Sequence, residues 1–143
     1  MTILEEFEEF LGGDIVVGNA VIGFIPNKDI FTLNTGDYGP AVGTLLDLGQ
    51  CVLLRCNFTF KEYNFQQNAV DALLCCNLIN RNFKWIKSVL DEGYYLELKG
   101  EALTGNDDWY NDILELLEQY LACAAFIYDE CCKKYGKFEA SSR

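Results

Sequence analysis

The chain has 143 residues, the length of one domain with a buried core, and we expect residues 1–143 to form a single domain. Half of the residues are hydrophobic and only two are proline, which excludes a disordered or low-complexity chain. Acidic residues outnumber basic ones by 22 to 11, and the resulting net charge of −11 repels phosphate backbones and anionic membrane surfaces. We therefore expect neither nucleic acid nor a membrane among its partners.

Features of export and membrane insertion are missing from the sequence. No run of 18 apolar residues could span a membrane, and the N-terminus MTILEEFEEFLGG lacks the basic region and apolar stretch of a signal peptide. These observations predict a cytoplasmic protein. In that compartment the seven cysteines are expected to be reduced thiols packed in the core.

The first predicted element is a short amphipathic helix. Thr2-Ile3-Leu4-Glu5 has the form of a capping box, in which the threonine hydroxyl accepts a hydrogen bond from the third helical amide. Gly12-Gly13 ends the helix. Two strands follow, at Ala20–Ile25 and Ile30–Asn34, and the Pro26-Asn27-Lys28-Asp29 sequence between them is typical of a turn.

The next segment is rich in glycine and precedes the longest predicted strand. Residues 35–49 contain four glycines, which predicts a loop with a short irregular strand near residues 44–48. In the strand at 50–60, apolar side chains alternate with a mixed set. The apolar face carries Val52, Leu54, Cys56, Phe58 and Phe60, and the mixed face carries Cys51, Leu53, Arg55, Asn57 and Thr59. The apolar face belongs to the core, while the mixed face meets either solvent or a partner.

The second half of the chain predicts a helix, a hairpin and a long helix. The middle helix, from Asn64 to about Asn80, is apolar almost all round and must be covered on more than one side. Two apolar-rich runs joined at Asp91-Glu92-Gly93 predict a hairpin that extends the sheet. The last helix, from about 107 to 135, has acids in its first turns and lysines at its end, as the helix dipole favours. The predicted fold is α+β, in the order α-β-β-β-α-β-β-α, with an antiparallel sheet packed against helices.

The side chains that usually carry catalysis or bind metals are scarce. The chain has no histidine, which excludes Ser-His and Cys-His nucleophiles and histidine metal sites. The cysteine pairs Cys75-Cys76 and Cys131-Cys132 are adjacent, whereas structural zinc needs a gap of about two to four residues. We therefore expect no metal and no cofactor.

Carboxylates are the remaining candidates for catalysis. Asp108 and Asp112 share a helix face and, with Asp107, could in principle act as acid and base. An acidic first turn is far more often a capping and dipole feature. We therefore expect that the protein is not an enzyme.

Aromatic residues crowd the hairpin and the last helix. Most must belong to the core, but exposed aromatic side chains are favoured anchors at protein interfaces. The candidates for partner binding are Trp85, Tyr95 and Tyr110.

The order of elements, with Asn77-Leu78-Ile79-Asn80 closing the middle helix, resembles the YbjN family. The resemblance rests on CCNLINRNFKWIKSVLDEGYYLELKGEAL and WYNDILELLEQYLACAAFIYDEC and covers residues 16–135 approximately. It implies the fold of type III secretion chaperones, which are small, acidic, usually dimeric proteins that hold extended partner segments, and it implies no catalytic residues. The glycine-rich segment 35–49 and the absence of a proline before the last helix depart from the family pattern.

These observations lead to two hypotheses about function. The first is a non-enzymatic, chaperone-like adaptor that binds a protein segment as a homodimer. The alternative is a regulatory or sensory domain that binds a small ligand, with the 35–49 loop closing over a pocket.

Overall fold

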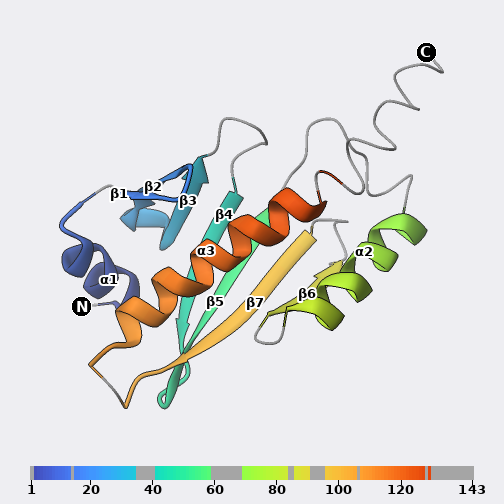
Figure 1. The fold of residues 1–143 in the computed structure, drawn as a ribbon. Coiled ribbons are helices and arrows are strands. Elements are labelled where there is room, and N and C mark those ends of the chain that lie inside the picture. The colour runs from blue at the N-terminus through green and yellow to red at the C-terminus, as the bar shows by residue number, and fades with distance from the viewer. Residues whose placement is uncertain are drawn as a thin grey trace.

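The computed structural model describes residues 2–13, 15–34, 41–58, 69–83, 86–90, 96–105, 107–127 and 129 (Figure 1). The elements in chain order are α1 (Ile3–Leu11), β1 (Ile15–Val17), β2 (Ala20–Ile25), the 3-10 turn η1 (Pro26–Lys28), β3 (Ile30–Asn34), β4 (Ala41–Asp47), β5 (Cys51–Phe58), α2 (Ala69–Asn82), β6 (Lys87–Leu90), β7 (Leu96–Leu103) and α3 (Trp109–Ile127). The strands form one antiparallel sheet in the order β1-β2-β3-β4-β5-β7-β6. The α+β class and the antiparallel sheet are confirmed.

The predicted order α-β-β-β-α-β-β-α is wrong in its number of strands. The described residues contain seven strands, and five of them precede α2. β1 was not predicted, because three residues are too few to show an alternation. Segment 35–49 was predicted as a loop with a short irregular strand near residues 44–48, but residues 41–47 form the full strand β4, which pairs with both β3 and β5. Residues 35–40 lie outside the described part of the chain.

Gly43 explains why the glycine content of residues 35–49 wrongly predicted a loop where β4 lies. This glycine lies opposite Phe31 in the register of β3 and β4. A Cβ atom at position 43 would meet the Phe31 ring at 2.2 Å, so the ring occupies the space where a side chain would stand. The glycine therefore permits close cross-strand packing, and a large aromatic ring compensates for its missing side chain.

Helix α1 begins and ends as its sequence predicts. The Thr2 hydroxyl oxygen accepts a hydrogen bond from the Glu5 amide at 3.2 Å, and the same hydroxyl donates to the Glu5 carboxylate at 3.2 Å. Gly12 ends the helix in the left-handed conformation with φ of 74°. The helix buries Leu4 and Phe7, and Phe7 contacts Phe24 and Trp109.

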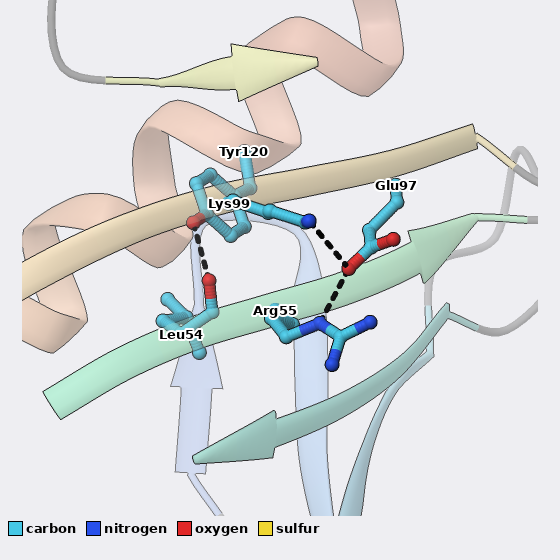
Figure 2. A network of polar contacts seen from close by, with 5 residues as sticks. All are labelled: Leu54, Arg55, Glu97, Lys99 and Tyr120. Atoms are coloured by element: carbon cyan, nitrogen blue, oxygen red, sulfur yellow. Dashed lines mark hydrogen bonds and ion pairs between the residues drawn. The ribbon is translucent and has the colours of Figure 1, made fainter. Parts of the chain in front are cut away.

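Helix α3 crosses the sheet diagonally and covers its apolar face (Figure 1). Val52, Leu54, Cys56 and Phe58 are buried on this face, as the alternation predicts. The fully buried Tyr120 donates a hydrogen bond to the Leu54 carbonyl oxygen at 2.8 Å (Figure 2). Gly100, the partner of Leu54 in β7, makes room for this contact, because a Cβ atom there would lie 2.9 Å from the Tyr120 hydroxyl.

Helix α2 packs against β6 at one edge of the sheet. Asn80 joins the two elements: its side-chain oxygen accepts from the Ser88 amide at 2.6 Å, and its side-chain nitrogen donates to the Ser88 carbonyl at 3.0 Å. The carboxamide thus binds the free backbone edge of β6 as a neighbouring strand would. The hairpin of β6 and β7 extends the sheet as predicted, and its connection at 91–95 lies outside the described residues.

Within a single chain, the described residues of the middle helix are covered on one side only, and not on more than one as predicted. In α2, Cys75, Cys76 and Ile79 are buried, whereas Val70, Leu73, Leu74 and Leu78 are exposed. The physical reason is that α3, and not α2, covers the central strands, so α2 buries only the face that meets β6. The predicted start at Asn64 and the predicted end of the last helix near 135 lie outside the described residues.

Candidate interaction surfaces

The face of the sheet opposite α3 carries a network of charged side chains (Figure 2). Glu97 on β7 is only 3% exposed, and its carboxylate contacts the Arg55 guanidinium of β5 and lies 3.9 Å from the Lys99 ammonium. A buried carboxylate is costly unless it is paired and hydrogen-bonded. The two cations therefore explain how Glu97 can occupy a central strand.

The register of the sheet aligns three basic residues on this face. Arg55 lies opposite Lys99, and Lys99 lies opposite Lys87, so the three side chains form a row across β5, β7 and β6. We call these residues the basic row. Like charges directly opposite each other in a sheet are unfavourable. Glu97 offsets Arg55 and Lys99, whereas Lys87 is exposed and has no ion pair within the described part of the chain.

Apolar side chains flank the basic row on the same face. Leu46 is 48% exposed and lies opposite Leu53, and Leu103 is 68% exposed and lies opposite Cys51. Val16, Val21 and Val42 are also exposed on this face. Exposed apolar side chains on one face of a sheet are a feature of interaction sites. The mixed face that the sequence predicted for residues 50–60 thus belongs to a surface on which cations and apolar groups lie side by side.

A second apolar surface lies on α2. Val70, Leu73, Leu74 and Leu78 follow each other at helical spacing, opposite the buried side of the helix. We call these four residues the α2 face. A helix face that is this apolar and meets no other described element lacks the partner that such a face normally has.

The structure places one of the three predicted partner-binding residues. Tyr110 is half-buried at the start of α3, and its ring stacks on Phe10 of α1 with centroids 4.5 Å apart and an interplanar angle of 12°. Trp85 and Tyr95 lie outside the described residues. Partner binding by all three residues stays a prediction.

The carboxylates considered for catalysis lie at the N-terminus of α3. Asp107 and Asp108 precede the helix, and the Asp108 carbonyl oxygen accepts hydrogen bonds from the amides of Asn111 and Asp112 at 3.0 and 3.1 Å. This arrangement agrees with a role in starting the helix. Among the described residues, no group of three or more histidine, cysteine, aspartate or glutamate side chains could hold a metal ion.

The cysteines only partly follow the prediction of reduced, packed thiols. Cys51, Cys56, Cys76 and Cys123 are free, but Cys75 is disulfide-bonded, with a partner outside the described residues. Burial raises the pKa of the Cys56 thiol and raises that of Cys123 to about 12. Thiols with raised pKa values stay protonated and are poor nucleophiles, so these two are core residues.

Sequence reasoning missed the basic row and the Asn80 contact. Both depend on strand register and on the position of a helix beside an edge strand, which a single sequence does not show. One feature of the sequence did indicate the row: in β7, Glu97 and Lys99 alternate with Leu96 and Leu98. The two charged side chains therefore lie on the same face of the strand.

Comparisons with protein-family models, with curated protein sequences and with solved structures found no match. The resemblance to the YbjN family and to type III secretion chaperones therefore stays a prediction. In the described part of the chain, no helix is long and apolar enough to cross a membrane.

Proposed function

We propose that this protein is a non-enzymatic, chaperone-like adaptor that binds a segment of another protein and works as a homodimer. The observation that carries the proposal is the α2 face, with four exposed aliphatic side chains on a helix that is otherwise anchored to the sheet. Fully burying one such side chain contributes about 1.5–3 kcal/mol. A second copy of the same helix supplies a matching apolar face, as a two-fold symmetric interface requires.

The two edge strands of the sheet offer few free backbone groups to a partner strand, which favours binding of a partner on a face of the sheet. The edge strands of the described sheet, where a partner strand could pair, are β1 and β6. β1 has three residues, which offers few backbone groups, and the Ser88 backbone of β6 is already bonded to Asn80. A bound segment is therefore expected to lie on the uncovered face of the sheet and not to add a strand.

The alternative of a small-ligand domain stays a prediction, although one part of it is corrected by the structure. It required residues 35–49 as a loop that closes over a pocket, and residues 41–47 are instead a strand paired on both sides.

The oligomeric state tests the proposal. Light scattering after size exclusion should give twice the chain mass of 16.2 kDa for the wild type. Leu74→Lys should give the monomer, because a lysine would bury its charge in the α2–α2 interface. Leu103→Lys places the same charge on an exposed leucine of the sheet face and should stay dimeric. A monomeric wild type at about 100 μM, well above the Kd of a stable homodimer, would contradict the proposal.

A further inference from the structure

The basic row is unusual for a chain of this charge. Three of the eleven basic residues lie in consecutive register positions, although the chain carries 22 acids that could have separated them. The buried Glu97 carboxylate contacts Arg55 and Lys99, and the exposed Glu101 lies opposite Leu53 on the same face. Lys87 is exposed and Lys99 is half-buried, so the row brings three cations together on one face of an acidic protein.

The surroundings of the row indicate the kind of ligand it fits. Apolar side chains lie on both sides of the basic row, two residues away along the strands. Leu46 and Leu53 lie on one side, and Val42 and Val89 lie on the other. A small anion would use the cations and leave these side chains in water. A peptide that carries both carboxylates and apolar side chains would use both.

We propose that the basic row recognises an extended acidic segment of a partner protein, in which every second side chain faces the sheet and these side chains include two carboxylates flanked by apolar residues. This inference rests on the proposed adaptor function and names the chemistry of the segment. Adjacent strands lie about 4.8 Å apart, so the row spans about 10 Å. Alternate side chains of an extended segment lie about 7 Å apart, so two consecutive acidic positions can reach the row together.

Charge complementarity with the partner also accounts for the placement of Lys87. Its side chain is exposed, and no carboxylate of the described residues forms an ion pair with it. A carboxylate from a bound segment would provide that partner. Lys87 should therefore contribute to binding while contributing little to stability.

Fluorescence anisotropy with defined peptides tests the inference. The probe is a labelled peptide whose alternate positions carry valine, glutamate, glutamate and leucine on one face, with serine between them. The comparison peptides carry glutamine or lysine in place of glutamate. We expect the acidic peptide to bind at least about tenfold more tightly than the glutamine peptide at low salt, with affinity falling as salt rises. The lysine peptide should not bind.

The matched variants are Lys87→Glu on the row and Lys28→Glu in the distant turn η1. They change the net charge of the protein equally, so a general field effect would weaken binding in both. We expect Lys87→Glu alone to weaken binding of the acidic peptide by about tenfold or more. Circular dichroism of both variants checks that each is folded.

Three results would overturn the inference. Equal binding of the acidic and glutamine peptides would show apolar recognition without charge, and equal effects of the two variants would show a field that is not local. Competition by inorganic phosphate as effective as that of the acidic peptide would show simple anion binding. None of these results changes the oligomeric state, so the proposed dimeric adaptor would still stand or fall on its own test.

Discussion

Replacing Gly43 by alanine should destabilise the protein strongly, although alanine normally suits a strand better than glycine does. The new methyl group would lie 2.2, 2.5 and 2.6 Å from the three outermost atoms of the Phe31 ring. Normal carbon–carbon contacts are about 3.5–4.0 Å, so the ring must move by more than about 1 Å. Phe31 is fully buried and packs near Phe24 with ring centroids 6.4 Å apart, which leaves little space for such a shift.

The expected cost follows from these contacts. Overpacking a core usually costs about 1–3 kcal/mol, and the short distances place Gly43→Ala at the upper end, near 3 kcal/mol. Phe31→Leu removes the outer ring atoms that cause the clash and should itself cost about 1–2 kcal/mol. In the Phe31→Leu background, Gly43→Ala should cost less than about 0.5 kcal/mol or even stabilise, because alanine loses less backbone entropy than glycine.

Urea denaturation followed by circular dichroism would measure the free energy of unfolding of the four proteins in this cycle. The predicted coupling between the two positions is about 2–3 kcal/mol, well above the error of the extrapolation. If Gly43→Ala costs the same with phenylalanine and with leucine at position 31, then the ring does not occupy the space above the glycine. Close packing against Phe31 would then not be the reason for a glycine in β4.

Two further predictions concern buried groups of the core. Tyr120→Phe should lower the free energy of unfolding by about 1–2 kcal/mol, because the Leu54 carbonyl loses its buried donor, whereas Tyr110→Phe should change it by less than about 0.5 kcal/mol. Stability should also fall at alkaline pH, because burial raises the pKa of Cys123 from about 9 to about 12. The stabilisation from this raised pKa is complete below pH 9 and is lost as the pH rises toward 12, by about 1.4 kcal/mol per pH unit. Urea titrations between pH 7 and pH 10 should therefore show a smaller fall for Cys123→Ala, and an equal fall in both proteins would exclude this thiol as a source.

The elements that the sequence predicted well are those whose signals are local. Helix α1 carries its own cap and its own terminating glycines, and β5 alternates over its full length. The capping hydrogen bond to Thr2 and the buried alternate residues of β5 were therefore recognisable from neighbouring positions alone. The class of the fold follows from such local signals, because they define how many helical and extended segments must share one core.

The features that could not be predicted depend on distant residues. Gly43 indicates a loop by its composition, and only the Phe31 ring, reached through strand pairing, makes it part of a strand. The leucines of α2 indicate burial in the same way whether they face a core or an interface, so composition could not tell the two apart. Arg55 and Lys87 are far apart in the chain, and they share a row only because β7 lies between their strands.

The contact between Asn80 and β6 also depends on the amide form of the side chain. An asparagine side chain has a donor on one side and an acceptor on the other, and β6 uses both. Spontaneous deamidation would turn this residue into aspartate, whose charged carboxylate has only acceptors. The Ser88 amide would keep its partner, but the Ser88 carbonyl would face a negative oxygen and would be pushed away. One deamidated side chain would thereby reopen an edge of the sheet, and an open edge is where chains of neighbouring molecules join and aggregate.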